Sequence, residues 1–250
     1  MFKKFTRRKV RDEVSNHKIT IVIPLYIYPS IQEGSEWHRL AQSSSKVDIV
    51  AIINPNSGPG DALNSDYVAG VAMLRDAGIE IFGYVHTQYG QRDKDLVSSE
   101  IKAFSEWYAV DGIFLDEGSS EHHIVSYYNS LNTYIKEFHV PDSPRMKSVI
   151  LNTGVEPHDS YYDACDNLVT CENYWKDFQQ AHLSGAREKS LALLHTCPTA
   201  KDMTKAVKKA AASEFVGIFV TDLGMPNPWC ALPSYWDEEV ELIASLSKPK

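Results

Sequence analysis

The 250-residue chain has no apolar run long enough to cross a membrane as a helix, which takes about 18 or more residues. The run that follows the basic start, residues 19–25, contains Pro24 and is typical of a strand rather than of a signal-peptide core. An Asn-X-Ser/Thr acceptor for N-linked glycans is also absent. The sequence therefore predicts no membrane span and shows no secretion signal or anchor.

Cysteine is scarce, and its spacing argues against a zinc site. The four cysteines form no Cys-x-x-Cys pair. Cys165 and Cys171 flank one predicted strand and would lie roughly 20 Å apart, too far for a disulfide. A Cys171–Cys197 or a Cys197–Cys230 pair could meet at neighbouring strand ends. We expect free, buried thiols.

Several catalytic signatures are missing. No Gly-x-Ser-x-Gly elbow occurs, which argues against a serine hydrolase, and no lysine follows a predicted strand, which argues against Schiff-base aldolase chemistry. The Gly- and Pro-rich residues 54–60 lack both the Gly-Lys-Ser/Thr ending of a phosphate loop and the Gly-x-Gly-x-x-Gly spacing. These residues favour a rigid turn that lines a cleft.

Charge is unevenly distributed along the chain. Residues 1–18 hold seven Lys and Arg against Asp12 and Glu13, so the overall net charge of −8 leaves −13 on the remaining 232 residues. An acidic body disfavours nucleic acid and suits a neutral or cationic ligand. We expect residues 1–18 to be a flexible basic leader and residues 19–250 to be one domain and a monomer.

Eight apolar, β-branched segments alternate with helical patterns. The helical patterns cover residues 66–74, 100–109, 125–138 and 199–212, and the fifth connection has room for one turn at residues 161–165. Eight strict repeats of strand and helix predict an α/β fold, a single (β/α)8 TIM barrel. The predicted strands are residues 19–25, 47–53, 79–85, 112–116, 148–152, 167–172, 191–195 and 216–222.

Carboxylates follow two of these strands. The strand at residues 112–116 ends at Asp116 with Glu117 beside it, and the strand at residues 167–172 ends at Glu172. In barrels of this kind the chemistry sits at the carboxyl ends of the strands. Capping or solvated acids are the alternative, but the preceding apolar runs favour catalysis. Because side chains alternate, only one of Asp116 and Glu117 can face the lumen of a regular strand, whereas Leu168, Thr170 and Glu172 share a face.

Aromatic, amide and histidine side chains gather at the other strand ends, as a sugar cleft requires. Aromatic residues follow closely at Tyr174, Trp175 and Trp229. His86 and His195 could join the acids at a metal, but no His-x-His or His-Glu-x-x-His spacing supports one, so we predict no metal and no cofactor. The predicted substrate-binding residues are Tyr26, Asn54, Tyr84, His86, Asn152, Tyr174, Trp175, His195 and Asp222.

Five segments in order make the chain resemble the spherulation-specific (spherulin 4) family over about residues 19–246: residues 24–29, 54–60, 84–87, 111–117 and 171–175. The resemblance implies a (β/α)8 barrel and an endo-α-1,4-N-acetylgalactosaminidase that cleaves galactosaminogalactan with retention. It places the acid cluster on Asp116, Glu117 and Glu172. It also suggests a secreted or cell-surface protein, although no signal is visible here.

For that α-linkage the 2-acetamido group is cis to the leaving oxygen and cannot attack from the opposite face. A retaining enzyme must then supply its own carboxylate, with the two carboxyl groups about 5–5.5 Å apart. We assign Asp116 as nucleophile, Glu172 as general acid/base with a raised pKa, and Glu117 as an orienting charge. The alternatives are a non-catalytic barrel that binds poly- or oligosaccharide, and a metal-dependent enzyme that uses Asp116, Glu172, His195 and Asp222.

Overall fold

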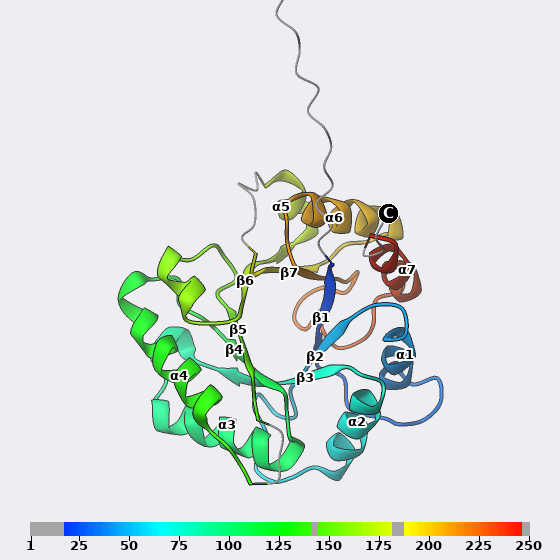
Figure 1. The fold of residues 1–250 in the computed structure, drawn as a ribbon. Helices are drawn as coiled ribbons and strands as arrows, with labels where there is room; N and C mark the ends of the chain where they lie inside the picture. The colour runs from blue at the N-terminus through cyan, green and yellow to red at the C-terminus, as the bar shows by residue number, and fades with distance from the viewer. Residues whose placement is uncertain (1–17, 142–144, 182–187, 247–250) are drawn as a thin grey trace, which may run out of the picture.

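The computed structural model describes residues 18–141, 145–181 and 188–246, and over these it shows a closed barrel of eight parallel strands (Figure 1). Each strand pairs with the next, and β8 pairs with β1, which closes the sheet. The predicted (β/α)8 barrel is confirmed. The strands are β1 (Thr20–Leu25), β2 (Ile49–Ile53), β3 (Glu80–His86), β4 (Gly112–Asp116), β5 (Ser148–Asn152), β6 (Asn167–Tyr174), β7 (Ser190–His195) and β8 (Gly217–Val220).

Helices cover the outside of the barrel (Figure 1). The four predicted helical segments are all present, and Thr199 caps α6 by accepting the backbone N–H of Asp202. The short fifth connection contains a 3₁₀ turn, η3 (Asp159–Asp163). The helices are α1 (Glu36–Ser43), α2 (Ser65–Asp76), α3 (Lys94–Tyr108), α4 (Val125–Glu137), α5 (Trp175–Gln180), α6 (Ala200–Ala212) and α7 (Trp236–Leu246), with further 3₁₀ turns η1 (Gln88–Gly90) and η2 (His122–Ile124).

Strand β4 shows why the strands of this barrel have continuous apolar sequences: both of its faces are buried. Ile113, Phe114 and Leu115 are each no more than 1% exposed, because one face of the strand packs against side chains in the barrel interior and the other packs against helices. Each such side chain contributes about 1.5–3 kcal/mol by leaving water. Helix α3 packs closely on the neighbouring strand β3: a Cβ added to Gly83 would lie only 2.5 Å from a ring carbon of Phe104. Buried apolar layers therefore hold the strand ends rigidly in place.

Strand β6 carries a β-bulge that changes which side chains face the lumen. Val169 lies level with Leu191 of β7, but the next paired residue is Cys171, level with Ala192, so Thr170 is an extra residue. Beyond the bulge, Glu172 lies level with Leu193. Leu191 and Leu193 share a face, so Val169 and Glu172 share it too. The predicted alternation from Leu168 through Thr170 to Glu172 is therefore wrong, since the bulge turns Glu172 into the barrel.

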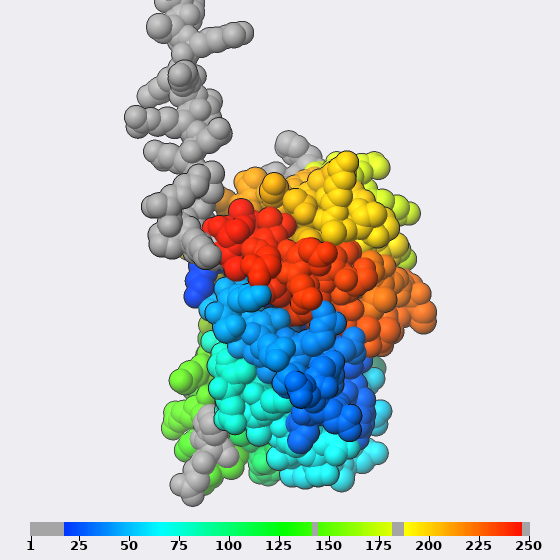
Figure 2. All heavy atoms as spheres, turned by 90° about the vertical axis from the view of Figure 1, so that its right-hand side faces the viewer, coloured from blue at the N-terminus to red at the C-terminus, as the bar shows by residue number. Residues whose placement is uncertain are grey.

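The last helix closes the outer wall. Figure 2 shows α7 (red) directly beside α1 (blue). Trp236 at the start of α7 donates its indole N–H to Ser43 Oγ at 3.0 Å, and both side chains are buried. Glu239 of the same helix is fully buried and accepts the backbone N–H of Val220 on β8 at 2.9 Å. Helix α7 thus joins both sides of the β1–β8 seam.

Candidate active site

Two carboxylates from different strands meet on one amide group. Asn152, the last residue of β5, donates from Nδ2 to Asp116 Oδ1 at 2.7 Å and to Glu172 Oε2 at 2.5 Å. Its own Oδ1 accepts the backbone N–H of Gly154 at 3.0 Å. Because that oxygen is already bonded, the amide must turn both of its N–H groups toward the two acids. Asn152 thus fixes the geometry of the acid pair.

The shared amide also limits how far apart the acids can be. Two oxygens at 2.7 and 2.5 Å from one nitrogen are separated by no more than about 5.2 Å. Retaining glycosidases have carboxyl groups about 5–5.5 Å apart, and inverting enzymes need about 6.5–9.5 Å to admit a water. This pair of Asp116 and Glu172 oxygens is therefore closer than the inverting spacing and compatible with the retaining one.

Asp116 lies in an environment that buries it but also donates hydrogen bonds to it. Burial, the largest effect, and the Glu117 charge raise the pKa of Asp116 above its usual value, and hydrogen bonds from Tyr84, from the backbone N–H of Glu117 and from Asn152 oppose this rise. The Tyr84 hydroxyl donates to Asp116 Oδ2 at 2.8 Å. Because burial and the neighbouring Asp116 charge raise the pKa of Tyr84, this phenol stays a donor. Three donors favour the ionised form of Asp116.

Glu172 has the opposite balance. Burial, and then the charge of Asp116, raise the pKa of Glu172 to about 7, and the single opposing contact is the N–H from Asn152. The predicted raised pKa of Glu172 is therefore confirmed. Burial raises the pKa of both acids, but Glu172 accepts one hydrogen bond that lowers its pKa against three on Asp116, so Glu172 is the better placed of the two to hold a proton.

Glu117 also reaches the cavity, because the strand ends before it. Its backbone is left-handed, with φ of 51°, so the alternation of a regular strand no longer applies. Thr87 Oγ1 donates to the backbone oxygens of both Asp116 and Glu117 at 2.9 Å, and Tyr89 N–H donates to Glu117 O at 2.7 Å. His86 Nδ1 lies 3.6 Å from Glu117 Oε2. Both neighbouring acids can therefore face the same space.

Gly118 is required by close packing at the same corner. A Cβ at this position would lie 2.4 Å from the backbone oxygen of Asn152. The Gly118 N–H donates to that same oxygen at 2.7 Å. The β4 and β5 strand ends are thus clamped together, which holds Asn152 against Asp116.

These groups line a cavity of about 630 Å³ at the carboxyl end of the barrel. Residues 225–229, from the connection between β8 and α7, form one wall of this cavity. The ring centroid of Trp229 in this segment lies 6.1 Å from that of His195. Burial lowers the pKa of His195, which favours the neutral imidazole. The predicted site residues that line the cavity are Tyr26, Asp116, Glu117, Asn152, Glu172 and His195.

Three other predicted residues contact side chains that line the cavity. Tyr84 holds Asp116, and His86 approaches Glu117, as described above. Tyr174 extends β6 two residues beyond its predicted end, and its ring packs edge-on against His195 at 4.3 Å between centroids. These side chains support the site without lining it.

Asn54, Trp175 and Asp222 lie outside the cavity, contrary to expectation. Asn54 Oδ1 accepts the Gly58 N–H and so closes the predicted rigid turn. Trp175 is 6% exposed because it begins α5 and packs inward. Asp222 accepts the Ser234 N–H and orders the connection between β8 and α7. Each lies just past its strand, but local hydrogen bonds or packing direct its side chain elsewhere.

Tyr89 and the loop at residues 225–228 line the cavity but were not predicted as site residues, and Trp229, which also lines it, was predicted only as an aromatic residue close to the strand ends. Trp229 stands seven residues beyond the predicted end of the eighth strand, so only its aromatic character could have marked it. Among the described residues, no group of three or more His, Cys, Asp or Glu side chains is placed to hold a metal ion. All four cysteines are free thiols, as predicted, but only Cys165 and Cys197 are buried, whereas Cys171 is half-buried and Cys230 is exposed. No helix within the described ranges is long and apolar enough to span a bilayer.

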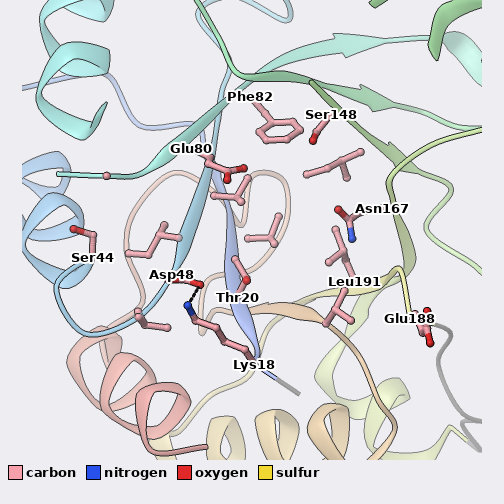
Figure 3. Close-up of a pocket in the computed structure, with 17 residues that line it drawn as sticks. Lys18, Thr20, Ser44, Asp48, Glu80, Phe82, Ser148, Asn167, Glu188 and Leu191 are labelled. Atoms are coloured by element: carbon pink, nitrogen blue, oxygen red, sulfur yellow. Dashed lines mark ion pairs between the residues drawn. The ribbon is translucent and has the colours of Figure 1, made fainter. Parts of the chain in front are cut away.

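A separate cavity of about 530 Å³ opens at the amino end of the strands (Figure 3). Lys18 and Asp48 form an ion pair there, and residues 1–17, which hold the rest of the predicted basic leader, lie outside the described residues. Thr20, Phe82 and Leu191 reach it from the strands. This end of such barrels serves stability rather than catalysis.

The fold and the acid pair at the carboxyl end of the strands define a glycoside-hydrolase-like (β/α)8 barrel. The chain belongs to spherulation-specific family 4, whose family model matches residues 20–243. The resemblance seen in the sequence is thereby confirmed. Spherulin-4 of Physarum polycephalum is 35% identical over 173 residues, which is 68% of this chain and 49% of that protein, so the chain spans about half the length of this curated relative.

Solved structures agree with this assignment. Aspergillus clavatus Sph3, crystallised in complex with GalNAc, is similar with a TM-score of 0.79 and 26% identity, covering 91% of this chain and 98% of Sph3. The C-terminal domain of a putative chitinase from Desulfitobacterium hafniense has a TM-score of 0.63 at 10% identity, covering 93% of this chain and 100% of that domain. A chitinase from Rhizomucor miehei has a TM-score of 0.55 at 12% identity, covering 92% and 100% of the two chains. At such identities the two chitinases show a shared fold alone.

Proposed function

We propose that the chain is an endo-acting glycoside hydrolase that cleaves α-1,4-linked N-acetylgalactosamine or galactosamine polysaccharide, such as galactosaminogalactan, with retention. The observation that carries this proposal is the pair of half-buried acids held on Asn152, with oxygens no more than about 5.2 Å apart. A spacing this short leaves no room for a water between the acids and favours direct attack by one of them.

The different environments of the two acids assign their roles. Asp116, with three donors, is the ionised nucleophile that attacks the anomeric carbon. Glu172, with its pKa raised to about 7, gives its proton to the departing glycosidic oxygen. The resulting glycosyl–Asp116 ester is then hydrolysed by a water that Glu172, now ionised, deprotonates. Glu117 orients the pair through its charge.

Two further observations support a hexosamine polymer as substrate. The similar Sph3 was crystallised with GalNAc. The described residues that line the cavity include Asp116, Glu117 and Glu172 but no lysine or arginine. A cavity of that charge suits a neutral or partly deacetylated, cationic sugar chain.

A digest of defined polymers tests the proposal. The protein is incubated with α-1,4-linked galactosamine polymers of differing acetylation and with β-1,4-linked chitin and chitosan oligosaccharides, and products are identified by mass spectrometry. We expect oligosaccharides from the α-linked polymers alone. Binding without any cleavage would instead support the non-catalytic barrel, and cleavage abolished by a chelator would support the metal-dependent alternative.

A further inference from the structure

A further cavity adjoins the catalytic one at the carboxyl end of the barrel. Its volume is about 430 Å³, beside about 630 Å³ for the catalytic cavity. Tyr89, Gly118 and Thr153 line both. Because three residues form a common border, the two cavities are parts of one groove across the carboxyl end of the barrel. We call the 430 Å³ part the outer cavity.

Tyr89 stands at this border in an unusual conformation. Its side chain is 61% exposed, and its backbone is left-handed with φ of 56°, directly after Gln88 with φ of 48°. Two successive non-glycine residues in this region are strained, and such strain concentrates at functional positions. The Tyr89 N–H is fixed on Glu117 O at 2.7 Å. An aromatic ring is therefore held at the groove by the backbone of the acid strand itself.

The outer cavity has the mixed character of a sugar-binding surface. Ile124 and Val155 supply apolar surface, the latter 57% exposed, and Gln91, Ser120 and Glu121 supply polar groups. Thr153 is positioned by donating to Val155 O at 2.7 Å. Among the described residues that line the outer cavity no lysine or arginine occurs. A pyranose presents an apolar face for a ring to cover and hydroxyls for polar groups to bind.

We propose that the outer cavity is a further sugar subsite, which holds a hexosamine unit of the same polymer beyond the two units that span the acid pair of Asp116 and Glu172. Tyr89 stacks on the sugar ring, and Glu121 faces a free or acetylated amine. The inference rests on the proposed function for the identity of the sugar, but the subsite itself requires binding and not cleavage.

Length-dependent binding tests the subsite. Affinities of an α-1,4-linked galactosamine disaccharide and hexasaccharide are measured by titration calorimetry in an Asp116→Asn background, which slows turnover. We expect the hexasaccharide to bind about 10-fold more tightly than the disaccharide, and Tyr89→Ala to remove most of that advantage by weakening the hexasaccharide far more than the disaccharide. Tyr89→Trp should keep it.

Tyr28→Ala provides the matched control, since Tyr28 is 63% exposed but lines neither cavity. Equal loss of the length advantage in both variants, or no loss in Tyr89→Ala, overturns the subsite. The outcomes also separate from those of the proposed function. If the wild-type protein cleaves the polymer but Tyr89→Ala keeps the length advantage, the proposed function is supported and the subsite is overturned. If the length advantage depends on Tyr89 but no cleavage occurs, the subsite is supported and the proposed function is overturned. An absence of binding to either oligosaccharide overturns both.

Discussion

The Asn152 amide is the contact on which the arrangement of the two acids depends. It lowers the pKa of Asp116 and of Glu172 by donating to each, and it is itself anchored on Gly154. A charge-assisted hydrogen bond of this kind contributes about 1.5–3 kcal/mol. Asn152 is thus a positioning residue for the acid pair, whereas the sequence suggested only that it binds substrate.

We predict that Asn152→Ala lowers kcat by about 10- to 100-fold, the equivalent of one such bond. Because both carboxyl pKa values rise when the donor is lost, both limbs of the pH profile of kcat/KM should move to higher pH. Asn54→Ala is the control, since Asn54 makes a matching bond to the Gly58 N–H but touches neither acid. An unshifted profile in Asn152→Ala would show that the amide does not tune the pair.

Substitution of the acids themselves gives a larger effect. Asp116→Asn and Glu172→Gln keep the shape of each side chain but remove the nucleophile and the proton donor. Each should reduce kcat at least about 10²-fold in steady-state assays on an α-linked galactosamine polymer, since acid/base catalysis alone is worth about 10²–10⁴-fold. Glu80→Gln, at the opposite end of the barrel (Figure 3), should keep full activity. Wild-type rates in either acid variant would remove that residue from the mechanism.

Within the strands, the pattern of apolar residues was sufficient to place all eight, but not to place every side chain. Asp116 could be located because β4 is regular up to its last residue. Glu172 was located at the correct strand end for the wrong reason, since the Thr170 bulge reverses the face and no residue type announces a bulge there. Glu117 was ambiguous because its left-handed φ depends on hydrogen bonds from Thr87 and Tyr89, which belong to another loop.

The clamp between β4 and β5 yields a prediction for Gly118. A methyl group at this position would lie 2.4 Å from Asn152 O, a backbone atom that cannot rotate away. Gly118→Ala should therefore lower the free energy of unfolding by about 1–3 kcal/mol and reduce activity, because Asn152 must shift. Gly224→Ala should be milder, since its Cβ would lie 3.3 Å from a side-chain oxygen of Thr196. Urea denaturation and initial rates measure both effects, and equal costs for the two variants would contradict this account of Gly118.

Across the whole molecule, the sequence predicted architecture better than it predicted the walls of the cavity. Strand count and order follow from local periodicity, so the barrel could be inferred. The lining from Tyr89 and from residues 225–228 could not, because these residues belong to loops whose paths depend on contacts with distant residues. Trp175 shows the converse: it follows a strand closely, yet packing directs it into the protein. Residues at regular strand ends are thus predictable, and those on loops are not.

Stability should depend on pH through Glu239, which joins α7 to β8. Burial raises the pKa of Glu239 well above its usual value, and one of its oxygens has no hydrogen-bond partner among the described residues. The native state therefore holds this proton more tightly than the unfolded chain. The associated stability is complete below about pH 4.5 and is lost progressively as pH rises toward the higher native pKa, with Glu172 acting in the same direction.

We predict that Glu239→Gln, which keeps the acceptor for Val220, is more stable than the wild-type protein at pH 8 by on the order of 1–3 kcal/mol. The two proteins should be nearly equal at pH 4. Urea denaturation at both pH values measures the difference. Glu238→Gln, an exposed neighbour on the same helix, should show the wild-type pH dependence. Parallel pH profiles for Glu239→Gln and the wild type would mean that Glu239 is not held protonated.

The anomeric configuration of the first product distinguishes attack by Asp116 from attack by water. The separation of no more than about 5.2 Å between Asp116 and Glu172 oxygens supports the proposed attack by Asp116 itself, which would give two displacements at the anomeric carbon. Proton NMR of a freshly started digest of an α-1,4-linked galactosamine oligosaccharide should show the α-anomer at the new reducing end before mutarotation. A first-formed β-anomer would contradict the nucleophilic role of Asp116.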